Sequence, residues 1–238
     1  MIRFSVSYSL SFNSLIFPNS QHSLADCPFR KSLLRSGTMT PSASHSTRIA
    51  LFGGSFDPVH DGHIEISRRA MDQAALDRVI FLPCRISPHK ADGPLPASGE
   101  DRLELLRLAT ADLPWATIDD FDLTAPPPSY SFRTVEEMTR RHPEAKLFWL
   151  LGRDQWEALP RWKEPERLAR SVEFLVFSRE GAPVPRPGWS MQALQGVHPA
   201  SSTAIRRALA AGRPPDHLHP AVLAAIRARG LYGVADLA

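Results

Sequence analysis

Short apolar runs alternate with longer segments of helical periodicity from residue 48 to the end of the chain. This alternation is typical of βαβ units, whose right-handed crossovers build a parallel sheet with helices on both faces. The sequence therefore predicts a single α/β domain with a Rossmann-like, doubly wound parallel sheet. The predicted strands cover 48–52, 78–83, 116–121, 146–152 and 173–178, and the predicted helices cover 63–76, 99–111, 131–142, 154–170 (broken near two prolines), 202–211 and 220–229.

Ligands of such sheets bind beyond the carboxyl ends of the strands, so the first loop is informative. It reads GGSFDPVHDGH, residues 53–63. Gly53 and Gly54 have no Cβ, which predicts a tight turn and the close approach of a ligand. His60 and His63 stand three residues apart at the start of a helix, near backbone N–H groups that have no partner within the helix. We expect an anion site here, and phosphate suits it best.

Other interpretations of this loop are less consistent with its spacing. It contains no Gly-Lys-Ser/Thr, which excludes a Walker P-loop, and its glycines do not follow the G-x-G-x-x-G pattern. Zinc would need a third ligand nearby. The remaining alternative is that the two histidines only cap and pack a helix.

A second candidate phosphate site lies near the other end of the chain, in ASSTAIRRALAAG, residues 200–212. Three hydroxyl side chains, of Ser201, Ser202 and Thr203, stand at a predicted helix start and precede Arg206. An ordinary N-cap would use one of these hydroxyls. Three hydroxyls with an arginine favour the β- and γ-phosphates of a nucleotide.

These motifs resemble those of a known family. GGSFDPVHDGH resembles the nucleotidyltransferase loop of the H-x-G-H superfamily, and ASSTAIR resembles the I-S-S-T-x-I-R signature of nicotinate-nucleotide adenylyltransferases, with Ala200 where isoleucine is usual. The resemblance implies that ATP and nicotinate mononucleotide react to give deamido-NAD and pyrophosphate, with Mg²⁺ arriving on ATP. It implies His60, His63 and Arg206 as catalytic residues. The residues that it implies for ATP or phosphate binding are Gly53, Gly54, Ser55, Phe56, Gly152, Asp154, Ser202 and Thr203.

Three further segments resemble the acceptor side of that family: LPCRISPHK (82–90), PPSYSFRTV (127–135) and LLGRDQWEALPRWKEPERL (150–168). Each allows a plainer interpretation, as solvated surface charges, a packing tryptophan or a helix-capping aspartate. A related adenylyltransferase for nicotinamide mononucleotide or phosphopantetheine, or a nucleotide-binding regulator without turnover, are the alternatives. The implied acceptor-binding residues are His89, Lys90, Tyr130, Trp162 and Arg179.

The N-terminal segment has an unusual composition. Residues 1–46 are rich in serine, and their four cations against one anion account for the whole formal charge of +3. We expect a disordered or mis-annotated extension, with translation starting at Met39, although a transit-type leader has a similar composition. The nucleotidyltransferase domain would then cover 47–238.

The rest of the chain carries equal numbers of basic and acidic residues, which argues against a nucleic-acid partner. The two cysteines, Cys27 and Cys84, provide no disulfide framework, so a reducing cytoplasm fits best. No apolar run approaches the roughly 20 residues that a membrane span needs. We therefore expect a cytoplasmic enzyme of small-molecule substrates, with a homo-oligomer possible.

Overall fold

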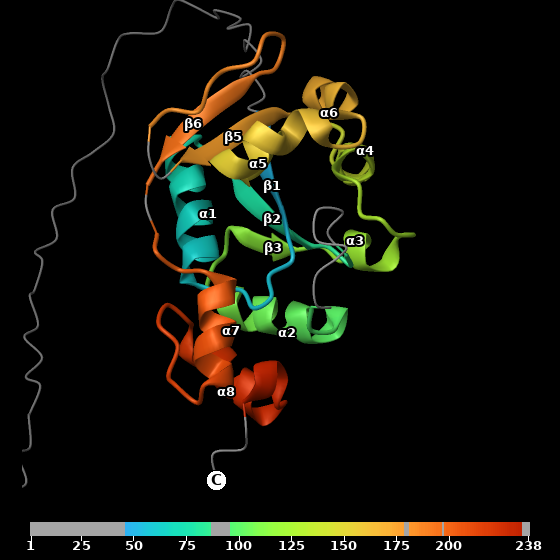
Figure 1. Ribbon diagram of the computed structural model, residues 1–238. Coiled ribbons are helices and arrows are strands. Elements are labelled where there is room, and N and C mark those ends of the chain that lie inside the picture. Colours follow the sequence, from blue (N-terminus) through green and yellow to red (C-terminus); the bar gives the residue numbers. More distant parts are fainter. Residues whose placement is uncertain (1–45, 87–95, 179–180, 197, 235–238) are drawn as a thin grey trace, which may run out of the picture. The chain divides into compact units, whose positions relative to one another are not determined.

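The computed structural model describes residues 46–86, 96–178, 181–196 and 198–234. They form a six-stranded parallel sheet with the order β3-β2-β1-β4-β5-β6 (Figure 1). This architecture confirms the predicted doubly wound α/β class. The strands are β1 (Arg48–Gly54), β2 (Arg78–Pro83), β3 (Ala116–Ile118), β4 (Lys146–Gly152), β5 (Glu173–Ser178) and β6 (Met191–Gln195).

Helices cover both faces of the sheet, because the buried strands present alternate side chains to each face. On β1, Ala50 and Phe52 join the core beneath α1, α2, α7 and α8, whereas Ile49 and Leu51 join the core beneath α4, α5 and α6. The helices are α1 (Asp61–Gln73), α2 (Gly99–Thr110), α3 (Phe121–Thr124), α4 (Ser131–Arg141), α5 (Arg153–Ala158), α6 (Pro165–Ser171), α7 (Ser202–Ala210) and α8 (Pro220–Ala228), with 3-10 turns at Leu159–Arg161 and Leu231–Gly233.

Proline explains why the predicted helix 154–170 is broken. Pro160 lies in the 3-10 turn that follows α5, and Pro165 is the first residue of α6, where its missing N–H costs no helical hydrogen bond. Glu164, just before α6, has a φ of 54°, so the chain changes direction there. The predicted break is confirmed.

Several elements differ from the prediction. The strand predicted over 116–121 ends at Ile118, because the Asp119 carboxylate accepts a hydrogen bond from the backbone N–H of Phe121 (2.9 Å) and starts α3. The edge strand β6 is missing from the prediction. Leu194 is its only buried residue, so its sequence has little of the apolar character of the inner strands. The predicted extension 1–46, with Met39 and Cys27, lies outside the described residues except for Ser46.

Candidate active site

The candidate site lies between β1 and β4, where the order in which successive strands join the sheet reverses. β1 pairs with β2 on one side and with β4 on the other, and the crossovers from β1 and from β4 cover opposite faces. In open parallel sheets such a reversal leaves a crevice beyond the carboxyl ends of the two central strands. The loop after β1 leads into the N-terminus of α1 (Figure 1).

The two glycines of this loop serve packing. Gly53 and Gly54 are the last residues of β1, so the prediction that they form the turn is wrong. A Cβ on Gly53 would lie 3.1 Å from the Trp149 ring, and one on Gly54 would lie 3.1 Å from the Phe56 ring. The turn comes at Phe56, which has a φ of 47° and a side chain that is only 2% exposed. Any contact of Phe56 with a ligand would therefore use its backbone.

The two histidines stack on each other at the start of α1. The ring centroids of His60 and His63 are 3.7 Å apart, and His60 occupies the N-cap position. The backbone N–H of His60 donates to Nδ1 of His63 at 3.2 Å. An Nδ1 that accepts a hydrogen bond is unprotonated, so neutral His63 carries its proton on Nε2. His63 can therefore donate from Nε2 to an anion. The alternative that the histidines cap and pack a helix agrees with the Nδ1 contact and with the contacts of the His63 ring with Phe52 and Phe56.

Gly62, between the histidines, gives the stacked pair its space. A Cβ on Gly62 would lie 3.0 Å from Nδ1 of His60 and 3.1 Å from Nδ1 of His198. Both distances are shorter than ordinary van der Waals contacts, so alanine at this position would displace a ring. His198 is a neighbour that sequence reasoning missed, because it lies far along the chain after β6.

Helix α7 meets the first loop, as the paired motifs predict. The Ser202 hydroxyl donates to the carbonyl of Pro58 at 3.0 Å. Nη1 of Arg206 donates to the carbonyl of Asp57 and lies 3.6 Å from the Asp57 carboxylate. Thr203 is exposed at the same helix start. The structure thus brings the hydroxyl-arginine helix start against the loop that leads into the histidine pair.

The predicted ribose and acceptor residues are more dispersed. Gly152 ends β4, and a Cβ on it would lie 2.7 Å from Oδ1 of Asp154, so the exposed Asp154 side chain folds back over the glycine. Tyr130 is the N-cap of α4, and Trp162 is half-buried; both pack against the core beneath α4, α5 and α6. This is the face opposite α1. His89, Lys90 and Arg179 lie outside the described residues.

Arg102 is a residue of the site region that sequence reasoning missed. Its guanidinium is 1% exposed and donates to the carbonyls of Ser55 (2.7 Å), Cys84 (2.9 Å) and Ala97 (2.9 Å). It therefore ties the loop after β1 to the loop after β2. The position of Arg102 in the sequence could have indicated this role, since Arg102 stands three residues before Leu105 on the apolar stripe of α2. A charged residue on such a stripe needs buried partners.

Two titratable groups lie near the carboxyl end of β2, the buried Asp122 and the half-buried Cys84. The Asp122 carboxylate is 6% exposed and accepts a hydrogen bond from the Thr134 hydroxyl at 2.7 Å. Burial raises the pKa of Asp122 to about 6 despite that bond, and the charge of Asp119 adds to the shift. Burial also raises the pKa of the Cys84 thiol. Cys84 is thus poorly suited to act as a nucleophile.

A cavity of about 430 Å³ lies on the outer side of His60, between α1, α2 and α8. Its walls are mostly apolar, and Ile64, Leu108 and Val222 contribute to them.

Within the described ranges, no group of three His, Cys, Asp or Glu side chains has a metal-binding arrangement. The helices in those ranges are also too short and too polar to span a membrane.

The fold and site define a class of protein. Stacked histidines at the start of the first crossover helix, faced by a second helix start with hydroxyls and an arginine, are suited to hold a chain of phosphates at the switch point of a parallel sheet. Residues 51–208 match the family described as cytidylyltransferase-like, and the chain belongs to this family.

Relatives within the family carry a more specific name. A "probable nicotinate-nucleotide adenylyltransferase" of Neisseria gonorrhoeae is 38% identical over 199 residues, which cover 78% of this chain and 98% of that protein. Proteins of the same name from Methylacidiphilum infernorum and Geobacillus thermodenitrificans are 44% and 34% identical, and the alignments cover 56% and 78% of this chain and 65% and 86% of those proteins.

Solved structures confirm the fold. The nicotinic acid mononucleotide adenylyltransferase of Plasmodium falciparum, complexed with NaAD, superimposes with a TM-score of 0.66 at 17% identity. The superposition covers 79% of this chain and 98% of the other.

Proposed function

We propose that this protein transfers AMP from ATP to nicotinate mononucleotide, giving nicotinate adenine dinucleotide and pyrophosphate in NAD biosynthesis. The observation that carries the proposal is the stacked His60–His63 pair, joined through the loop 55–58 to Arg206 of α7. The names of the sequence relatives support the choice of acceptor.

The reaction needs no nucleophile from the protein. A phosphate oxygen of the mononucleotide attacks the α-phosphorus of ATP and forms the new P–O bond, while the bond to the bridging oxygen breaks and pyrophosphate leaves with the electron pair. Negative charge grows on the bridging oxygen and on the non-bridging oxygens. The Nε2–H of His63 and the guanidinium of Arg206 would neutralise this charge, and the fixed helix starts would hold the reacting atoms in line.

Mg²⁺ accompanies ATP in this proposal. The described part of the chain provides no carboxylate cage for the ion, so phosphate oxygens and water would supply its ligands. When bound, the ion would add positive charge beside the leaving pyrophosphate.

The acceptor side remains a proposal of residue roles. We assign His89, Lys90 and Arg179 to the phosphate and carboxylate of nicotinate mononucleotide, since the side chains of all three can donate hydrogen bonds to anionic oxygens. Trp162 and Tyr130 offer aromatic faces to the pyridine ring. Gly152 and Asp154 at the end of β4 would hold the ribose of ATP.

Pyrophosphate release from ATP and Mg²⁺ tests the proposal, with nicotinate mononucleotide, nicotinamide mononucleotide and phosphopantetheine compared as acceptors. We expect a strong preference for the nicotinate compound. His63→Ala should reduce kcat by at least about 10²-fold, the usual effect of removing a donor to a developing charge. His142→Ala is the matched control, since His142 caps the far end of α4. Release only with another acceptor, or near-normal turnover of His63→Ala, would contradict the proposal.

A further inference from the structure

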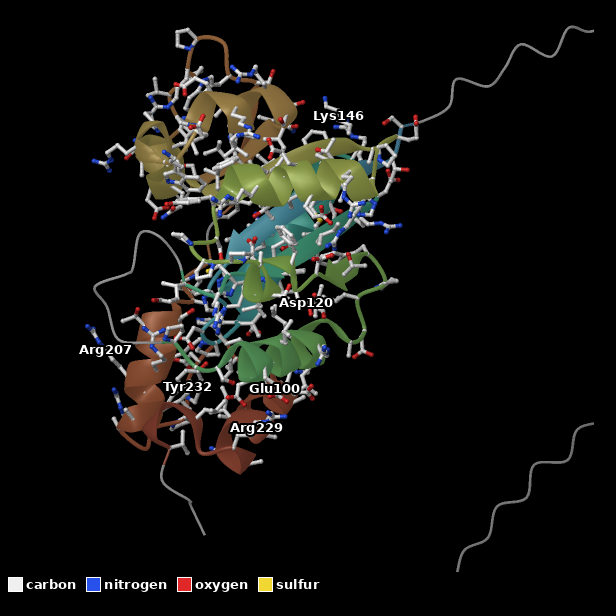
Figure 2. All side chains as sticks on the ribbon, turned by 90° about the vertical axis from the view of Figure 1, so that its right-hand side faces the viewer. Glu100, Asp120, Lys146, Arg207, Arg229 and Tyr232 are labelled. Carbon is white, nitrogen blue, oxygen red and sulfur yellow. The ribbon has the colours of Figure 1, made fainter. Side chains whose placement is uncertain are left out.

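The 3-10 turn at the end of the described residues contacts the loop after β1 through one tyrosine. Tyr232 lies in the 3-10 turn Leu231–Gly233, beside α7 (Figure 2). Its hydroxyl donates to Oδ1 of Asp57 at 2.8 Å. Its φ of 60° is in the left-handed region, which residues other than glycine seldom adopt. The surrounding packing must therefore hold the residue there.

The Asp57 carboxylate is contacted by three separate segments. Oδ1 accepts hydrogen bonds from the Tyr232 hydroxyl and from the backbone N–H of Ala97 (3.0 Å). Oδ2 lies 3.6 Å from Nη1 of Arg206, which donates to the Asp57 carbonyl instead. The Asp57 side chain is only 13% exposed, so solvent screens these interactions little.

Asp57 and Arg206 form a long ion pair. A direct charge-assisted hydrogen bond has a length of about 2.8 Å, whereas Arg206 and the Asp57 carboxylate remain 3.6 Å apart. The phenol of Tyr232 stays protonated, because burial and the neighbouring Asp57 charge raise its pKa. It is therefore a permanent donor that occupies Oδ1. Without it, the carboxylate is free to turn toward Arg206 and compete with phosphate oxygens for the guanidinium N–H groups.

We propose that Tyr232 is a positioning residue for ATP binding, which holds the Asp57 carboxylate and so leaves Arg206 available to the phosphates. The inference rests on the proposed function, since it takes Arg206 as a phosphate ligand. It gives a specific role to Tyr232, which lies 175 residues from Asp57 in the sequence.

Steady-state kinetics of Tyr232→Phe test the proposal. We expect the KM for ATP to rise about tenfold, as for the loss of a hydrogen bond to a charged group, and the KM for nicotinate mononucleotide to stay within about twofold. Thr110→Val is the matched control, because it removes a buried hydroxyl that donates to the Leu106 carbonyl (2.8 Å) on α2. It should lower the melting temperature while leaving the KM for ATP unchanged.

The double variant Tyr232→Phe/Asp57→Asn separates positioning from general damage. Asparagine keeps an acceptor for the Ala97 N–H but has no charge to capture Arg206, so it should restore the KM for ATP toward the wild-type value. An unchanged KM in Tyr232→Phe, or a raised KM that Asp57→Asn does not reverse, overturns the proposal.

Calorimetric titration with ATP distinguishes failure of this inference from failure of the proposed function. If the wild-type protein turns over none of the three acceptors, the proposed function fails, yet the Kd for ATP should still rise about tenfold in Tyr232→Phe. If Tyr232→Phe does not fold, Asp57→Asn alone should bind ATP at least as tightly as the wild-type protein, and weaker binding overturns the inference.

Discussion

Replacing Asp122 with asparagine tests whether burial raises the pKa of its carboxyl group. Asp122 is 6% exposed in α3, and its carboxylate has one side-chain partner among the described residues, the Thr134 hydroxyl at 2.7 Å. Burial, assisted by the charge of Asp119, raises the pKa from its usual 3.8 to about 6 in the folded protein. Asparagine has nearly the same shape and retains an oxygen for Thr134, so the substitution removes mainly the charge.

The sign of the effect follows from which state holds the proton more tightly. Below about pH 3 the carboxyl group is largely neutral in the folded and the unfolded chain, and it contributes almost no difference. As the pH rises from 3.8 through about 6, the unfolded chain releases its proton first, which favours unfolding. A pKa difference of about two units corresponds to about 3 kcal/mol. Asp122 should therefore lower the free energy of unfolding by about 3 kcal/mol at neutral pH relative to its contribution below about pH 3.

Urea denaturation of the wild-type protein and of Asp122→Asn at about pH 4.5 and about pH 7.5 measures about 2 kcal/mol of this difference, because the unfolded carboxyl group is already largely ionised at pH 4.5. The variant should gain stability over the wild-type protein as the pH rises. Carboxylates with lowered pKa values, such as those of Glu65 and Asp101, are present in both proteins, so their contributions cancel. Asp120→Asn is the control, since Asp120 is exposed two residues away (Figure 2). An equal stability difference at both pH values would refute the reasoning.

The inner strands could be predicted from sequence because they are buried on both faces. β2, β4 and β5 have the predicted bounds, and each contains a continuous apolar run such as RVIFLP or EFLVFS. Such runs can be recognised from sequence, since their successive apolar residues alternate between the two cores. β6 lies at the edge, and its position depends on pairing with β5 and on the hydrogen bond from the Gln192 side chain to the Gln73 carbonyl (2.9 Å). Those contacts leave little trace in a five-residue window.

The residues of the candidate site also differ in how well the sequence predicts them. His60 and His63 could be chosen from local spacing, because both belong to one helix start. The contacts that hold the site together join residues far apart in sequence, such as Arg206 with Asp57 and Arg102 with Ser55. A single sequence does not show which distant residues are in contact. The glycine prediction was wrong for a related reason, since the side chain that fills the space beside Gly53 comes from β4, nearly a hundred residues later.

Three further substitutions test the packing from the site outward. Gly62→Ala places a Cβ 3.0 Å from the His60 ring and 3.1 Å from the His198 ring, so kcat should fall about 10²-fold in a protein that still folds, as expected for small displacements of reacting groups. Leu105→Ala removes a fully buried side chain, and urea denaturation should show a loss of about 2–5 kcal/mol. Val184→Lys should change stability by less than about 0.5 kcal/mol, because Val184 is 74% exposed. Similar unfolding midpoints for the last two variants would contradict the assignment of the core, since burial is the property that separates the two positions.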